Sequence, residues 1–129
     1  MTALRVIAAA VVDAGRLLVV SKRAAPAVFY LPGGKPEPSE SAHECLNREL
    51  CEELGVRIRD RRHLVEVRAP AALEASDMHM TVFLARLAGA PRRRGEIASL
   101  AWWPAAHDVT LAPAVRDHVV PALRARDLL

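Results

Sequence analysis

The most informative stretch of this sequence reads Gly33-Gly34-Lys35-Pro36-Glu37-Pro38-Ser39-Glu40 and, after a short interval, Arg48-Glu49-Leu50-Cys51-Glu52-Glu53-Leu54-Gly55-Val56. Glycine and proline break regular structure in the first part, and Ser39 followed by Glu40 is typical of a helix start. Leucines at 46, 50 and 54 repeat at helical spacing and predict a buried stripe, and Gly55 is a typical helix end. The stretch therefore predicts a loop that leads into a short helix.

The predicted helix carries a cluster of carboxylates beside its apolar stripe. At about 100° per residue, Glu49, Glu52 and Glu53 fall within an arc of roughly 100°. Carboxylates this close repel one another, and Mg²⁺, which prefers oxygen ligands and is often shared with substrate phosphates, would relieve the repulsion. Arg48 is spaced to pair with Glu44 or Glu52. Three glutamates alone are equally compatible with a solvated acidic face.

On the N-terminal side of this stretch, the sequence predicts strands. Residues 5–12 form an apolar run of strand length, residues 13–15 a turn, and residues 16–21 a second strand, so we expect a hairpin. Residues 24–28 contain Pro26 and are expected to form a loop.

On the C-terminal side, strands precede a final helix. Val56 with Ile58 and residues 64–67 are expected as strands on either side of a polar turn at 59–62, and residues 69–77 as a loop. Residues 78–87 and 97–103 are predicted strands, and residues 113–126 a helix with a kink at Pro121. This order of elements predicts one domain over residues 1–129, of the α+β or α/β class.

Composition narrows the class of partner. The chain has 129 residues, is 52% hydrophobic and 26% charged, and carries a net charge of +3, which favours anionic partners. Aromatic residues make up only 4% of it, so we expect a phosphate-bearing small molecule rather than a nucleic acid polymer. No apolar run reaches the roughly 20 residues of a membrane span. No signal-peptide pattern follows the first strand, so we expect a soluble cytoplasmic protein, as a monomer or homodimer.

The spacing of glycine, glutamate and arginine over residues 34–56 matches a known sequence motif. Gly34, Glu40, Arg48-Glu49-Leu50, Glu52-Glu53 and Gly55-Val56 match every defined position of the Nudix box, so the chain resembles the Nudix hydrolase family. The resemblance implies a mixed β-sheet sandwich flanked by helices (α/β/α). It also implies Mg²⁺- or Mn²⁺-dependent hydrolysis of a nucleoside diphosphate linked to a further group.

Roles follow by position within the box. The resemblance makes Glu49, Glu52 and Glu53 metal ligands, and one of them, or a residue of a neighbouring loop, the general base. It implies that Arg48 holds a glutamate in place. Gly34 and Lys35 would shape the loop beside the substrate phosphates. Glu40 would support the loop and helix more than it binds metal.

Features outside the box are similar to the MutT-like subgroup, which hydrolyses nucleoside triphosphates to a monophosphate and pyrophosphate. They are Arg23-Ala24-Ala25, His79-Met80-Thr81 and Glu96, and on this alignment Glu96 is a further metal ligand. Arg23, Tyr30 and His79 are candidate substrate contacts. Val115 stands near the position of the asparagine that reads oxidised guanine. An aliphatic side chain cannot make that hydrogen bond, so the resemblance does not extend to specificity for 8-oxo-guanine.

Other functions remain open at this point. A Nudix chain of this size is also compatible with a pyrophosphatase for ADP-ribose, another nucleoside diphosphate sugar or a dinucleotide. A module that senses a nucleotide without cleaving it is a further alternative. A basic nucleic-acid-binding domain would need no metal and would bind in a salt-sensitive manner.

Overall fold

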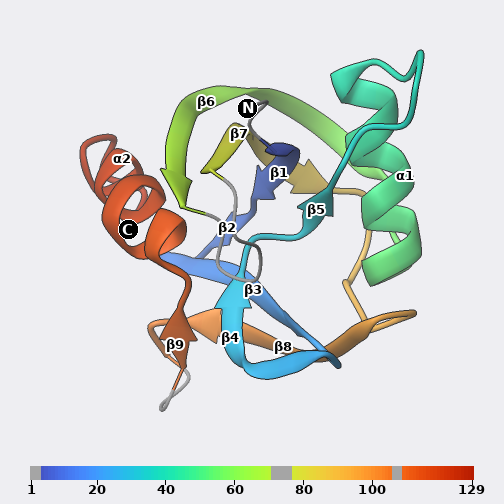
Figure 1. Ribbon diagram of the computed structural model, residues 1–129. Helices are drawn as coiled ribbons and strands as arrows, with labels where there is room; N and C mark the ends of the chain where they lie inside the picture. The colour runs from blue at the N-terminus through green and yellow to red at the C-terminus, as the bar shows by residue number, and fades with distance from the viewer. Residues whose placement is uncertain (1–3, 71–76, 106–108) are drawn as a thin grey trace.

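The first apolar run of the chain divides between two sheets. The computed structural model describes residues 4–70, 77–105 and 109–129 (Figure 1). Strand β1 (Leu4–Ala10) pairs in parallel with β7 (Asp77–Leu87) and antiparallel with β5 (Gly33–Gly34). Only β2 (Val12–Asp13) turns back onto β3 (Arg16–Lys22). The predicted hairpin is therefore wrong for β1. The alanines and isoleucine of β1 are buried on both faces, which suits a strand inside a covered sheet.

The first sheet has the order β5-β1-β7-β6, with β6 (Ile58–Pro70) at its edge. The predicted polar turn at 59–62 is wrong, because β6 runs through it and pairs with β7 along its length, with register shifts near Asp60 and Val65. An edge strand leaves one side open to solvent, so a run of charged residues is compatible with strand structure there. Of the predicted loop at 69–77, residues 71–76 lie outside the described residues.

The second sheet has the order β2-β3-β4-β9, and β8 also pairs with β3. Its remaining strands are β4 (Ala25–Tyr30), β8 (Ile97–Trp103) and β9 (Thr110–Leu111). The predicted loop at 24–28 is wrong, since Pro26 lies within β4. The β3–β4 pairing has an irregularity at this point, where a missing N–H is tolerated. The strands predicted at 78–87 and 97–103 are confirmed as β7 and β8.

Helices cover the opposite faces of the first sheet (Figure 1). Helix α1 (Ala42–Leu54) packs on Ile7 and Phe83. The C-terminal helix packs on Met80 and Val82 of the other face, and comprises a π-helical part, η1 (Val115–Val119), and α2 (Val120–Arg124). These layers confirm the α+β class. In the described part of the chain, no helix has the length and apolar character that a membrane crossing requires.

Candidate functional site

Two glycines join the loop to the first sheet and to the helix. Gly33 has φ +148°, and a Cβ there would overlap the carbonyl oxygen of Ile7 on the neighbouring strand. A Cβ at Gly34 would overlap the carboxylate of Glu49. Only glycine at position 33 allows the loop backbone to lie this close to β1, and a side chain at position 34 would displace the Glu49 carboxylate from its place.

Helix α1 is held at both ends. Ser41 is its N-cap and forms a capping box with Glu44, with hydrogen bonds of 2.9 and 3.1 Å. The predicted start at Ser39 is therefore two residues early, and Glu40 precedes the helix. Gly55 ends the helix with φ 67°, as predicted. The predicted leucine stripe is confirmed, since all three leucines are fully buried.

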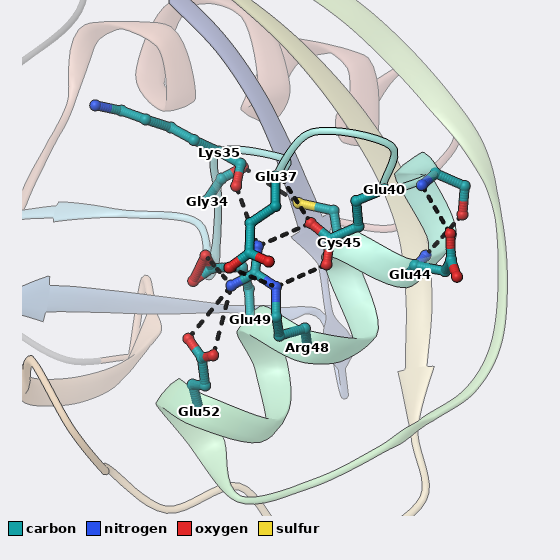
Figure 2. Close-up of polar contacts among 10 residues, drawn as sticks. Gly34, Lys35, Glu37, Glu40, Glu44, Cys45, Arg48, Glu49 and Glu52 are labelled. Atoms are coloured by element: carbon teal, nitrogen blue, oxygen red, sulfur yellow. Dashed lines mark hydrogen bonds and ion pairs between the residues drawn. The ribbon is translucent and has the colours of Figure 1, made fainter.

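Arg48 lies among four glutamates in one network (Figure 2), of which Glu37 is the most distant, with its Oε1 3.8 Å from Arg48 Nε. Its Nε and Nη2 donate to the carboxylate of Glu40 at 2.7 and 2.9 Å. Its Nη1 lies 3.2 Å from Glu49 Oε2 and 3.5 Å from Glu52, and Nη2 also donates to the carbonyl of Lys35 at 3.2 Å. Hydrogen bonds from the Arg48 guanidinium lower the pKa of Glu40 to about 2. Loop and helix are thus joined by one cation.

Glu53 is a buried carboxyl. It is 7% exposed, and its Oε1 accepts a hydrogen bond of 3.1 Å from the N–H of Gly33. Burial raises the pKa of Glu53 to about 8, against the opposing effect of that hydrogen bond, and repulsion from Glu49 and Glu96 adds to the rise. Burial also raises the pKa of Glu49, and the charge of Arg48 offsets part of that effect. Both carboxyls are therefore destabilised in their charged forms.

These residues border a cleft of about 510 Å³. One part of its lining is charged and comprises Glu49, Glu53, Glu96 and Lys22. Another part is apolar, and its members are Leu4, Val6, Met78, Met80, Ala112 and Val115. Tyr30 also lines the cleft, and its buried hydroxyl has no hydrogen-bond partner among the described residues. The cleft therefore joins a polar, acidic region to an apolar one.

The sequence matches the NUDIX domain over residues 1–123. The chain belongs to the Nudix family. As a member, it is a hydrolase of diphosphate bonds. It is 34% identical over 124 residues to a Mycobacterium tuberculosis protein named "Putative 8-oxo-dGTP diphosphatase 2", covering 92% of this chain and 87% of that protein.

Solved structures of other proteins share the fold. A MutT NUDIX hydrolase from Burkholderia pseudomallei is 28% identical with a TM-score of 0.70, covering 79% of this chain and 83% of its own. The E. coli ORF135 protein is 26% identical with a TM-score of 0.76, covering 98% of this chain and 94% of its own. The predicted family and fold are thus confirmed.

Most of the predicted Nudix site residues lie at the cleft. Those that line it are Tyr30, Gly34, Lys35, Arg48, Glu49, Glu53 and Glu96. Glu52 does not line it. Its side chain is 59% exposed and pairs with Arg48 at the end of the network. Four of the proposed metal or catalytic residues are therefore brought together, with Glu52 beside them.

Two predicted substrate contacts lie elsewhere. His79 bonds Glu66 of β6 at 2.7 Å and does not line the cleft, whereas its neighbours Met78 and Met80 do. Successive side chains of a strand point to opposite faces, so His79 cannot share their face. Arg23 is exposed and does not line the cleft, and Lys22 lines it instead. Strand alternation separates His79 from Met78 and Met80, and the pairing of the strands decides which of the two faces meets the cleft.

The donors at the cleft fit a hard divalent cation. The carboxyl groups of Glu49, Glu53 and Glu96 are oxygen ligands, and the raised pKa of Glu53 and Glu49 shows that their charges lack full compensation. Over the described ranges, no three acidic, histidine or cysteine side chains converge as a ready-made metal site. Glu52 is turned to Arg48, and Glu53 to the N–H of Gly33. The ligand types therefore fit a hard divalent cation.

Proposed function

We propose that this Nudix hydrolase cleaves nucleoside triphosphates to a nucleoside monophosphate and pyrophosphate, with Mg²⁺ or Mn²⁺ as cofactor. The observation that carries the proposal is the single cleft that joins carboxylates to an apolar surface. The acidic part suits metal-bound phosphates, and the apolar part suits the base and sugar. Residues from both ends of the described chain supply the apolar part.

Lys22 is the candidate phosphate contact that sequence reasoning missed. It lines the cleft, and its positive charge lowers the pKa of both Glu49 and Glu53, so it lies within electrostatic reach of both. Its Nζ also lies 5.8 Å from the centre of the Tyr30 ring. An ammonium group at this place would neutralise part of the charge of a bound phosphate chain.

The metal would be held by Glu49, Glu52, Glu53 and Glu96. When bound, it would neutralise phosphate charge and lower the pKa of a water molecule beside the phosphorus. Arg48 keeps Glu49 and Glu52 in orientation, and the N–H of Gly33 fixes Oε1 of Glu53. Glu49 and Glu53 are the candidates for accepting the proton of the attacking water, because a carboxylate with a raised pKa is a stronger base once it has released its own proton.

The residues that line the cleft offer few side-chain groups that could distinguish an oxidised base by hydrogen bonding. None of the residues that line the cleft has a side-chain amide, and Val115 occupies the apolar part. The chain contains one asparagine, Asn47, whose Oδ1 accepts a hydrogen bond from Ile58 N–H at 3.3 Å. We therefore propose that 8-oxo-dGTP and dGTP are hydrolysed with similar efficiency, although the M. tuberculosis relative is named for the oxidised nucleotide.

A substrate panel tests the proposal. Canonical nucleoside triphosphates, 8-oxo-dGTP, ADP-ribose and dinucleoside polyphosphates are each incubated with Mg²⁺ or Mn²⁺, and the products are separated by ion-exchange chromatography. We expect monophosphate and pyrophosphate from the triphosphates, with kcat/KM for 8-oxo-dGTP and dGTP within about tenfold of each other. Hydrolysis of ADP-ribose alone would support the alternative pyrophosphatase. No hydrolysis of any compound would favour a nucleotide-sensing module.

Glu52→Gln tests the metal assignment within the same assay. It removes one charge without a large change of shape, and we expect kcat to fall at least about 100-fold, because even indirect partners of a metal cost 10- to 100-fold. Asp117→Asn makes the same chemical change on the exposed surface of the C-terminal helix and serves as the control. Equal turnover of the two variants would remove Glu52 from the site.

A further inference from the structure

Half of the arginines gather in two short segments, one of which begins at the C-terminal end of the Nudix box helix. Residues 55–65 and 85–95 contain eight of the sixteen arginines and one acidic residue, Asp60. Because the whole chain has a net charge of +3, the remaining residues carry a net charge of −4. The positive charge is thus concentrated, and we call these two segments the arginine surface.

The two segments adjoin in space. Asp60 and Arg86 are register partners of β6 and β7, and their side chains form a two-pronged ion pair at 2.7 and 2.9 Å. Beyond the strands, the N–H of Ala88 donates to the carbonyl of Arg57 at 2.9 Å. The N–H of Arg92 donates to the carbonyl of Leu54 at 3.0 Å. The backbones of the two segments are therefore adjacent from the edge strand to the loop after β7.

Asp60 compensates only one of these charges. The hydrogen bond from Arg86 lowers the pKa of Asp60, and the positive charges of Arg59 and Arg62 lower it further. The carboxylate of Asp60 is thus bonded to Arg86 and lies within electrostatic reach of Arg59 and Arg62. Beside it is a recess of about 390 Å³ whose lining comprises Asp60, Arg61, Arg62, Leu84 and Arg86. It shares no lining residue with the catalytic cleft.

We propose that the arginine surface binds the phosphate backbone of duplex DNA, independently of base sequence. Arginine presents a planar fork that matches phosphate oxygens in two-pronged contacts. The two segments contain no phenylalanine, tyrosine or tryptophan, so they offer no platform for unpaired bases. In a duplex the bases are paired and the phosphates are exposed. A surface with many arginines and no aromatic residues can therefore bind a duplex through its phosphates. The scarcity of aromatics disfavours stacking on single strands and does not bear on contacts of this kind.

A competing explanation is protection of the sheet edge. Charged side chains on an edge strand prevent pairing with other chains, and β6 is such a strand. Protection does not account for Arg92, Arg93 and Arg94, which lie in the loop after β7 and outside any strand. It also predicts no ligand, so binding measurements separate the two explanations.

The test compares two variants from which equal charge is removed. The first combines Arg57→Gln, Arg59→Gln and Arg62→Gln, whose side chains make no hydrogen bond within the described ranges. The control combines Arg5→Gln, Arg116→Gln and Arg124→Gln, which are exposed and outside the arginine surface. Fluorescence anisotropy measures the binding of a labelled 20-base-pair DNA duplex, its separate strand and inorganic polyphosphate at several salt concentrations, and thermal melting shows that each variant is folded.

We expect the wild-type protein to bind the duplex with micromolar affinity at low salt, more tightly than the single strand or polyphosphate. The first variant should bind the duplex at least tenfold more weakly, and its salt slope should be less negative by about 0.9 for each phosphate that it no longer neutralises. The control should keep the wild-type slope. Absence of duplex binding, equal weakening of both variants, or tighter binding of the single strand or polyphosphate would each overturn the proposal.

Discussion

Glu53 shows at the scale of one residue how the fold sets up the site. The helix places its side chain next to the leucine stripe, and the sheet covers it, so the carboxyl is almost entirely removed from water. The N–H of Gly33 is its one described hydrogen-bond donor. One donor does not replace the hydration that a charge has in water, and the pKa rises to about 8.

This shift predicts a pH-dependent gain from Glu53→Gln in the absence of metal. Between the ordinary value of 4.5 and about 8, the folded state holds a proton that the unfolded state has released, so stability falls as pH rises. Glutamine keeps the acceptor for Gly33 and never becomes charged. We expect its free energy of unfolding to exceed that of the wild type by about 1–3 kcal/mol more at pH 8 than at pH 5. Urea denaturation at the two pH values, with chelator present, measures the difference, and an equal difference at both would contradict the raised pKa.

The location of individual residues at the cleft was predictable from sequence for those that belong to a motif. The box placed Glu49, Glu53 and Arg48 at the cleft, and a resemblance outside it placed Glu96 there. The predictions of substrate contacts failed where the position of a residue along the chain decides which way its side chain points. His79 and Arg23 are one residue away from side chains that do face the cleft, and nothing in a local motif fixes which face of a strand is turned inward.

At the scale of the element, α1 was predicted well in its interior and poorly at its start. Ser39 and Ser41 are both acceptable N-caps by residue type. The capping box distinguishes them, because Ser41 is followed three residues later by Glu44, whereas Ser39 is followed by Ala42. The edge strand β6 was divided in the prediction because four charged residues in succession suggest a turn, although an edge strand tolerates them.

Ser41→Ala should destabilise the protein by about 1 kcal/mol, because it leaves the N–H of Glu44 without its cap. Ser39→Ala is the matched control, since the Ser39 side chain makes no hydrogen bond within the described ranges. Chemical denaturation of the two variants gives the comparison. A larger destabilisation from Ser39→Ala would mean that the helix begins earlier than Ser41.

At the scale of the whole molecule, sequence order identified the fold class but not the division of β1 and β2 between two sheets. Pairing partners separated by about 70 residues, such as Ala8 and Val82, determine that division, and no local pattern encodes them. The cleft depends on the same long-range pairing, since Val6 and Met80 are register partners in it. Most of the residues that meet at the cleft were therefore predictable from one motif, whereas the shape of the cleft was not.

Binding of Mg²⁺ should stabilise the whole fold in a pH-dependent manner. Glu53 must release its proton to act as a ligand, so metal affinity rises with pH up to about 8. We expect millimolar Mg²⁺ to raise Tm by about 2–8 °C at pH 8 and by much less at pH 6, and a chelator to reverse the rise. Differential scanning calorimetry provides the measurement. An equal rise in Tm at both pH values would contradict the prediction, because it would mean that Mg²⁺ binding does not require Glu53 to lose its proton.

The apolar part of the cleft draws on both ends of the described chain, Leu4 and Val6 at one and Ala112 to Val115 at the other. A nascent chain emerging from the ribosome therefore contains the complete box long before it contains a complete cleft. Acidic helix and glycine loop are synthesised within the first 56 residues, yet the wall that would hold a base arrives only with residue 115. The cleft is therefore complete only after the C-terminal helix has packed against the first sheet, long after the box itself has been synthesised.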